Sequence, residues 1–254
     1  MTAAEWCYDT APDLDQQIVE RLRRCPREPD MLVYGLRWVA ACYIRLSLRV
    51  FHRLHVIGVE HLPRDVSYVL VANHSSHLDT LCLLAALPWT SLHRAFPAAA
   101  ADCFFTRSSR VTLSATIVNA MPFDREAHYR QSLALCHQLL ACRGTILIFF
   151  PEGTRSLTGE IGEFRPGIGT LIAGTSIPVV PCHIAGAFEA WPKGRFLPRP
   201  GHLRLAIGTP RTFAEVAPGK ESVHLISREL RQAVMELAAV QSPARTGWMR
   251  TIVQ

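Results

Sequence analysis

The sequence predicts an α/β fold, with a central mostly parallel or mixed sheet flanked by helices and an amphipathic helical segment at the N-terminus. From Val66 onward, short apolar runs alternate with longer segments of helical periodicity, which is typical of strands joined by crossover helices. The 254 residues and the hydrophobic content of 49% supply a sizeable core. An apolar segment interrupted by arginines precedes this region and predicts the helical extension.

The predicted organisation is one domain with short extensions. We expect an N-terminal helical segment at a membrane interface over residues 1–55, the main domain over 56–241 and a loosely held tail over 242–254. No internal repeat, low-complexity stretch or linker divides the chain after Val66. The first 30 residues are rich in charge and lack the apolar stretch and cleavage site of a secretory signal, so we expect the cytoplasmic side.

The segment from Met31 to Phe51 is predicted to be an amphipathic helix. At 100° per residue, Arg37, Arg45 and Arg49 fall within about one third of the circumference and leave a broad apolar face. Such a helix suits a membrane interface better than a crossing position. The alternative is a helix that packs on the domain with its arginines in solvent. A net charge of +6 and a pI near 9.1 favour an anionic partner, which is a phospholipid surface, an acidic carrier protein or nucleic acid.

Strands and helices alternate through the rest of the chain. Apolar runs predict four strands, which are Tyr68–Ala72, Thr145–Phe150, Ile177–Ile184 and Leu203–Ile207. The prolines of the third run predict an edge position or irregular pairing. Helical periodicity and terminating residues predict three helices, which are Thr80–Leu87, Glu126–Cys142 and a closing helix with Val223, Ile226, Leu230, Val234 and Leu237 on one face.

The eight cysteines predict no disulfide framework. They include no Cys-x-x-Cys pair, and several lie in apolar runs, so we expect small buried hydrophobic side chains in a reducing compartment. The eight are Cys7, Cys25, Cys42, Cys82, Cys103, Cys136, Cys142 and Cys182.

A histidine and an aspartate follow the first predicted strand. Positions five apart on one continuous helix are rotated by about 140° and do not face each other. We therefore expect His74 on the turn, with Asp79 reaching back from the first helical turn to one imidazole nitrogen. The other nitrogen is then free to take a proton from a substrate hydroxyl. A buried pair of purely structural role is the alternative.

The residues around this pair suggest two further chemistries that the sequence does not favour. Ser75 and Ser76 lie outside any Gly-x-Ser-x-Gly nucleophile elbow, so direct transfer is preferred to a covalent intermediate. The His-x-x-His-x-Asp string from His74 to Asp79 lacks a recurrent zinc spacing, so no metal is expected. His77 is instead expected to be a pocket or helix-start residue.

A second polar motif, Phe150–Ser156, follows the strand at 145–150. Pro151 and Gly153 force a turn, and glycine lets the backbone approach a ligand closely. Arg155 offers a rigid fork of donors suited to phosphate, and Glu152 can fix a substrate hydroxyl or orient that arginine. The alternative is a strand-end turn with a surface ion pair.

A further arginine stands before the helix predicted at Glu126. Asp124 can cap that helix, and Arg125 either binds phosphate or pairs with the aspartate. This short motif alone does not choose between the two.

Taken in order, these motifs resemble the glycerolipid acyltransferase family, of the 1-acyl-glycerol-3-phosphate type. The resemblance covers roughly Val56 to Thr209. It is carried by the His-x4-Asp spacing of His74 and Asp79 and by three segments, which are Phe123–Arg125, Phe150–Ser156 and Ile177–Pro181.

The resemblance implies roles for individual residues. By it, His74 is the general base and Asp79 is its partner. The residues implied to bind glycerol phosphate are Arg125, Glu152, Gly153, Thr154 and Arg155. Those implied to shape the acyl pocket are Pro178, Val179 and Pro181.

The implied reaction transfers a fatty acyl group from acyl-CoA or an acyl carrier protein to the free hydroxyl of lysophosphatidic acid. The product is phosphatidic acid, and the reaction requires neither cofactor nor metal. Another lysolipid, a lyso-aminolipid or glycerol 3-phosphate is an alternative acceptor, and a non-catalytic membrane lipid-binding protein is an alternative of another class. Nucleic-acid binding is not expected, because the arginines form no stripe interleaved with stacking aromatics. We expect a peripheral protein on the cytoplasmic face of the cell membrane.

Two features depart from the family pattern. Phe123–Arg125 follows Met121 and Pro122, where the family more often has an upstream glycine and an isoleucine before the aspartate. The family also often begins with plainly hydrophobic transmembrane helices, whereas Met31–Phe51 is interrupted by arginines. The second departure favours a peripheral anchor.

Overall fold

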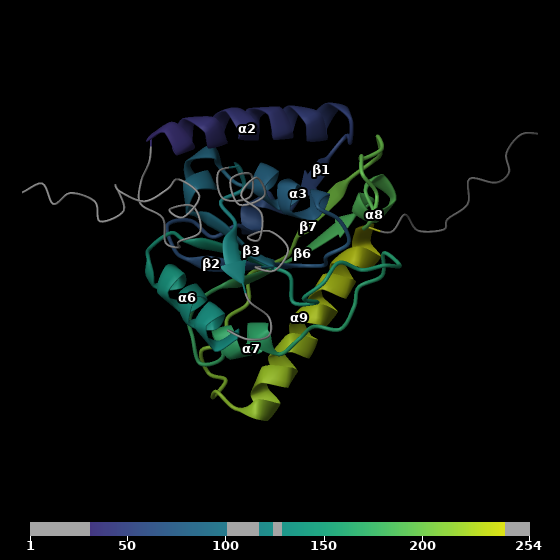
Figure 1. Cartoon of the computed structure of the whole chain (residues 1–254). Helices are drawn as coiled ribbons and strands as arrows, with labels where there is room; N and C mark the ends of the chain where they lie inside the picture. Colours follow the sequence, from purple (N-terminus) through teal and green to yellow (C-terminus); the bar gives the residue numbers. More distant parts are fainter. Residues whose placement is uncertain (1–30, 101–116, 124–128, 242–254) are drawn as a thin grey trace, which may run out of the picture.

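A seven-stranded mixed sheet forms the centre of the domain in the computed structural model, which describes residues 31–100, 117–123 and 129–241 (Figure 1). The strand order is β1-β7-β6-β2-β5-β3-β4. The five strands from β6 to β4 run parallel, whereas β7 is antiparallel to β6 and carries β1 parallel to itself. The predicted α/β fold with a mixed sheet is confirmed. The strands are β1 (His55–Ile57), β2 (Tyr68–Ala72), β3 (Ala95–Ala100), β4 (Met121–Phe123), β5 (Ile146–Phe149), β6 (Val179–Ala185) and β7 (Arg204–Ile207).

Helices cover both faces of the sheet, and each face has its own apolar core. Successive residues of β2 point to opposite faces, so Leu70 joins one core while Val69 and Val71 join the other. The first core lies under α2 (Met31–Val50), α3 (Leu78–Ala86) and α8 (Ala187–Ala190). The second lies under α6 (Tyr129–Ala141), α7 (Gly167–Ile172) and α9 (Lys220–Gln241). Two short 3-10 helices, η1 (Val59–His61) and η2 (Trp89–Arg94), complete the described elements.

The predicted helices are present with shifted ends. α3 begins at Leu78, two residues before the predicted start, and this places Asp79 in its first turn. The predicted start of the next helix at Glu126 and the tail after Gln241 lie outside the described residues. Cys82, Cys136 and Cys182 are buried as predicted, whereas Cys142 is exposed, because it follows α6 where the chain leaves the core.

Of the two outcomes predicted for the proline-containing strand, the edge position is wrong, since β6 lies between β7 and β2. The irregular pairing is confirmed, because β7 pairs only with Cys182–Ala185 of β6 and Val179 forms an isolated bridge with Arg211. The N–H of Val179 donates to the carbonyl of Arg211 at 2.8 Å, and residue 181, two positions on, faces the same side. β7 has already ended at Ile207 there, and the N–H of Gly208 donates to the carbonyl of Pro181 at 2.8 Å. The missing N–H of Pro181 therefore falls where no ladder bond is required.

α2 packs on the domain through its arginine side. Arg37 is only 4% exposed and donates a hydrogen bond of 3.1 Å to Oδ1 of Asn119. The guanidinium of Arg45 lies 3.7 Å from the centroid of the Trp89 ring and donates to the carbonyl of Leu87, just after α3. The alternative, a helix packed on the domain with its arginines in solvent, is wrong for these two residues, because their long side chains supply the contacts that attach the helix.

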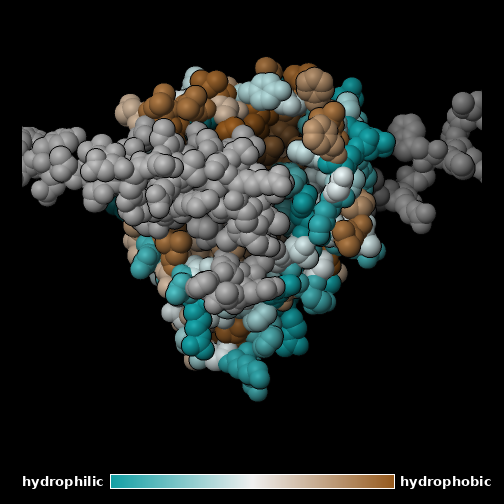
Figure 2. Space-filling view, in the orientation of Figure 1, coloured by the Kyte–Doolittle hydropathy of each residue, from teal (hydrophilic) through white to brown (hydrophobic). Residues whose placement is uncertain are grey.

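The opposite side of α2 is apolar and exposed. Figure 2 shows hydrophobic residues gathered along the upper surface of the molecule, where Figure 1 places α2. By length and composition alone, α2 is the one helix among the described residues that is long and apolar enough to cross a membrane. Its large exposed side chains are Met31, Leu32, Leu36, Trp38, Val39, Tyr43, Leu46 and Val50.

Candidate active site

The two polar motifs meet at one edge of the sheet. β2 and β5 are adjacent and parallel, with Val71 paired to Phe149, so their carboxyl ends lie side by side. His74 follows β2, and the Glu152–Arg155 loop follows β5. This edge is where open α/β sheets place ligands, because the loops after parallel strands gather there.

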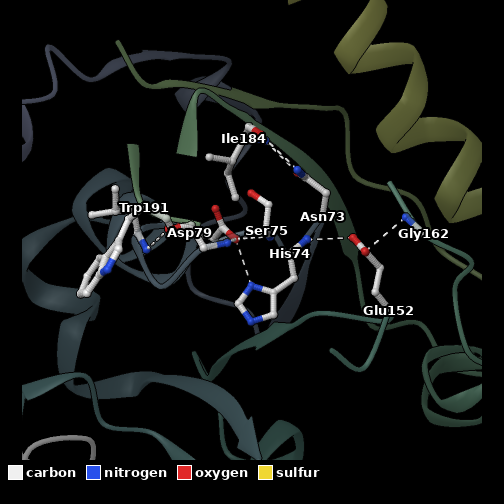
Figure 3. Close-up of polar contacts among 10 residues, drawn as sticks. Asn73, His74, Ser75, Asp79, Glu152, Gly162, Ile184 and Trp191 are labelled. Atoms are coloured by element: carbon white, nitrogen blue, oxygen red, sulfur yellow. Dashed lines mark hydrogen bonds and ion pairs between the residues drawn. The ribbon is translucent and has the colours of Figure 1, made fainter. Parts of the chain in front are cut away.

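The side chains of His74 and Asp79 are hydrogen-bonded as predicted (Figure 3). Nδ1 of His74 lies 3.0 Å from Oδ2 of Asp79, which is fully buried. The same oxygen accepts the backbone N–H groups of Ser75 at 2.6 Å and Ser76 at 2.7 Å. Because the carboxylate only accepts, the imidazole proton lies on Nδ1 and Nε2 carries the free lone pair.

The imidazole of His74 is also held in its plane. It stacks on the ring of Phe150, with centroids 4.1 Å apart and an angle of 19° between the planes. The side chain is 15% exposed, so it remains open to a substrate. A base that is fixed in tautomer and orientation, with Nε2 unprotonated, can accept a proton from a hydroxyl group.

Glu152 joins the two motifs through the backbone. Its Oε1 accepts the N–H of His74 at 2.8 Å, and its Oε2 accepts the N–H of Gly162 at 3.2 Å (Figure 3). The N–H of Ser156 donates to the carbonyl of His74 at 2.8 Å. Glu152 is 7% exposed, and burial raises the pKa of its carboxyl against the opposing effect of the two N–H donors. The structure thus places this carboxylate where it fixes the turn that carries His74.

Asn73 fixes the other side of the same turn. Its side-chain amide donates to the carbonyl of Ile184 at 3.0 Å and accepts the N–H of Ile184 at 2.8 Å (Figure 3). The side chain therefore continues the pairing of β2 with β6 by one residue after the β2 backbone has turned away. The turn is held between two strands before any ligand binds.

His77 lies at the rim of the site as a neutral imidazole. Its ring is tilted against that of Trp191, with centroids 5.4 Å apart. Burial lowers the pKa of His77 to about 4, and the positive charge of Arg155, together with that of His74 when it is protonated, acts in the same direction. Arg155 follows β5 in the same loop as Glu152, which binds the backbone of His74, so this loop brings it to the edge that carries His74.

The low pKa of His77 predicts a stability effect. Between pH 6.5, its ordinary value, and about pH 4, the unfolded chain binds a proton at residue 77 that the folded chain does not. The free energy of unfolding is therefore expected to fall as the pH is lowered through this window. His77→Gln removes this contribution and should flatten the slope. Urea denaturation of both proteins across the window measures it, and equal slopes would contradict the assignment.

Arg165 was not predicted from the sequence as a residue of the site. Gly153 adopts a left-handed conformation with φ of 73°, and a Cβ there would lie 2.8 Å from Nε of Arg165, so the arginine lies over the Glu152–Arg155 loop. Arg165 is exposed and makes no ion pair with any described carboxylate. It lies near Tyr129, whose pKa it lowers against the larger effect of burial. The sequence feature that could have indicated Arg165 is a basic residue ten positions after Arg155, where the chain comes back to the Glu152–Arg155 loop and the N–H of residue 165 donates to the carbonyl of Pro151.

The remaining predicted residues are only partly placed. Arg125 lies outside the described residues. Thr154 is exposed at the tip of the loop, as a ligand contact requires. Pro178 is half-buried before β6, whereas Val179 and Pro181 are buried within the sheet, so their contribution to an acyl pocket stays a prediction.

Comparison with known proteins defines the class. The model of the acyltransferase family matches residues 53–185, which is more than half of the 254-residue chain. The chain therefore belongs to the acyltransferase family. The matched region holds both motifs and ends at the end of β6.

Several relatives of this chain within the family share the name 1-acyl-sn-glycerol-3-phosphate acyltransferase. The chain is 30% identical over 200 residues to the 1-acyl-sn-glycerol-3-phosphate acyltransferase of Bacillus subtilis, covering 78% of this chain and 93% of that protein. It is also 30% identical over 177 residues to the chloroplastic 1-acyl-sn-glycerol-3-phosphate acyltransferase LPAT1 of Arabidopsis thaliana, covering 68% of this chain and 48% of that protein. The chain spans about half the length of the plant and algal relatives. The crystal structure of the 1-acyl-sn-glycerophosphate acyltransferase PlsC from Thermotoga maritima has the same fold, with a TM-score of 0.60 and 24% identity over 84% of this chain and 81% of that one.

Proposed function

We propose that this protein transfers a fatty acyl group from an acyl thioester to the free hydroxyl of lysophosphatidic acid, giving phosphatidic acid. The observation that carries the proposal is the His74–Asp79 pair, in which the carboxylate holds Nδ1, beside the Glu152–Arg155 loop. The names of relatives from bacteria, plants and animals support the acceptor. The donor is acyl-CoA or an acyl carrier protein.

In the proposed mechanism the acceptor hydroxyl attacks the thioester carbonyl directly. Nε2 of His74 takes the hydroxyl proton as the new ester bond forms, and the thiolate leaves when the tetrahedral intermediate collapses. The protonated imidazole returns the proton to the thiolate, while Asp79 stabilises the imidazolium. The hydroxyl of Ser76 donates to the carbonyl of Trp191 at 2.7 Å, so it serves the structure of the turn.

Arginines at the same edge supply the proposed phosphate site. Arg155 lies in the loop that follows β5, and Arg165 lies over Gly153 of that loop. Guanidinium groups bind phosphate through paired charge-assisted hydrogen bonds. The exposed guanidinium of Arg165 has no carboxylate to compete with a phosphate in the described parts of the chain. We assign both residues to the acceptor phosphate, with Arg125 as a third candidate.

The outer surface of α2 supports a peripheral position at the membrane. Arg37 and Arg45 contact the rest of the domain, which leaves the apolar side for contact with lipid. Tyr43 is exposed on that side, and such an aromatic side chain is typical of the interface between head groups and acyl chains. A helix attached in this way lies along the surface, on the cytoplasmic face in this proposal.

Thiol release with purified protein in detergent tests the function. Release is expected with lysophosphatidic acid and acyl-CoA or acyl carrier protein, and its absence with both donors would contradict the proposal. Arg155→Ala and Arg165→Ala should each lower kcat/KM for lysophosphatidic acid about tenfold to a hundredfold. With an acceptor that has no phosphate, the same two substitutions should lower kcat/KM much less. Arg143→Ala is the control, because this exposed arginine precedes β5 at the opposite end of the sheet.

A further inference from the structure

The segment between α8 and β7 exposes apolar and basic side chains together. We name residues 191–200 the 191–200 loop. Phe196 is 88% exposed and Leu197 is 64% exposed. Lys193, Arg195 and Arg199 flank them, are exposed, and form no ion pair with any carboxylate that the structure describes. Exposed phenylalanine and leucine with three unpaired cations indicate a surface that contacts a partner.

The exposure is built into the loop by its own hydrogen bonds. The N–H of Arg195 donates to the carbonyl of Pro192 at 3.2 Å, and that of Arg199 donates to the carbonyl of Ala190 at 2.8 Å. The indole N–H of Trp191 donates to the carbonyl of Arg195 at 2.8 Å. These bonds fold the loop back on α8 and hold its middle, with Phe196, outward.

The loop continues the apolar surface of α2. After the loop, the N–H of Gly201 donates to the carbonyl of Phe51 at 3.2 Å, and that of Leu203 donates to the carbonyl of His52 at 2.9 Å. Phe51, directly after α2, is 59% exposed. Figure 1 shows the chain after α8 rising toward the level of α2 at its C-terminal end, and Figure 2 shows hydrophobic residues on that part of the surface.

The base of the loop touches the proposed active site. The carbonyl of Trp191 accepts the hydroxyl of Ser76, and its ring packs near His77. A surface that engages the loop is therefore held at a fixed place relative to His74. An acceptor lipid in that surface needs this orientation, because its hydroxyl must reach Nε2.

We propose that the 191–200 loop is a second membrane-contact element, which buries Phe196 and Leu197 among anionic phospholipid head groups. Lys193, Arg195 and Arg199 then lie against the lipid phosphates. The continuity with α2 favours a lipid surface over an acidic carrier protein, since the chain after the loop is bonded to the residues that follow α2 and both elements expose apolar side chains. The proposal rests on the proposed function for its purpose, but the contact itself does not require catalysis.

Vesicle flotation without substrates tests the contact. The vesicles are phosphatidylcholine alone or phosphatidylcholine with phosphatidylglycerol in equal parts. The double variant Phe196→Ser/Leu197→Ser is expected to have a partition coefficient about tenfold lower on both kinds of vesicle. The reason is that it lacks the two apolar side chains whose transfer from water into the lipid favours binding. Leu225→Ser, at a 53% exposed leucine of α9, is the matched control and should bind as the parent protein does.

The charged residues are tested separately. The triple variant Lys193→Gln/Arg195→Gln/Arg199→Gln should lose about fivefold for each charge removed, only on the anionic vesicles and less at high salt. Phe196→Trp changes the same position but keeps an apolar aromatic side chain, so it should partition at least as well as the parent protein. This result would show that substitution at residue 196 does not by itself prevent binding.

Two results would overturn the proposal. One is unchanged partitioning of both the serine and glutamine variants. The other is a glutamine variant that binds anionic vesicles as the parent protein does but has a raised KM for an acyl-acyl carrier protein in detergent, which would assign the loop to the donor. Vesicle binding is measured without turnover, so failure of the proposed function appears separately, as absent thiol release.

Discussion

Replacement of His74 by alanine is expected to lower kcat by at least about a hundredfold to ten-thousandfold, because the general base is lost. The fold should be retained, since the imidazole is partly exposed and Glu152 binds the backbone N–H of residue 74, which alanine keeps. Asp79→Asn should also lower kcat strongly, because the amide no longer fixes the imidazole tautomer. Thiol release under saturating substrates measures both.

The matched control for this prediction is His137→Ala. His137 is an exposed histidine of α6, away from the edge that carries His74, and its loss should leave kcat unchanged. Thermal unfolding shows whether each variant is folded. A folded His74→Ala protein with the parent turnover would remove His74 from the mechanism and with it the proposed reaction.

The sequence predicted those parts of the site that depend on local geometry. β2 and β5 are apolar runs, so their positions followed from hydrophobicity alone. The bond between His74 and Asp79 followed from helical periodicity, because five positions on one helix cannot bring the side chains together. Adjacent parallel strands then carried both motifs to one edge.

Contacts between distant segments were not predictable in this way. Glu152 and Gly162 lie ten positions apart, and Glu152 lies 78 positions from His74, so nothing in the spacing indicates their hydrogen bonds. The position of β6 inside the sheet depends on where β7 ends opposite Pro181. β3 and β4 were missed because they contain alanine and proline instead of a long apolar run.

The orientation of α2 shows the same limit. The sequence gives a stripe of arginines on a helical surface, but periodicity does not determine whether that stripe faces solvent or the domain. The answer depends on Asn119 and Trp89, which lie far away in the chain and receive Arg37 and Arg45. With Arg37 and Arg45 turned inward, the apolar side becomes the outer surface.

Glu152→Ala is expected to reduce both stability and turnover. The substitution leaves the part-buried N–H groups of His74 and Gly162 without their acceptor. A fully buried group would lose about 1–3 kcal/mol of unfolding free energy, so we expect the lower part of this range for each. The turn that carries His74 should shift, and a displacement of about 1 Å can lower kcat about a hundredfold. Glu152→Gln keeps one acceptor and should be intermediate. Urea denaturation and the kinetic constants for the acceptor measure the effects.

This prediction separates two roles for the same carboxylate. If Glu152 acted by binding the acceptor, the alanine variant would raise KM for lysophosphatidic acid at the parent's stability. If it holds the turn, stability and kcat fall together while KM changes little. Glu160→Ala is the control, because this exposed glutamate lies in the same loop. The separation matters for the phosphate site as well, since a carboxylate committed to backbone N–H groups leaves Arg155 and Arg165 to bind the anion.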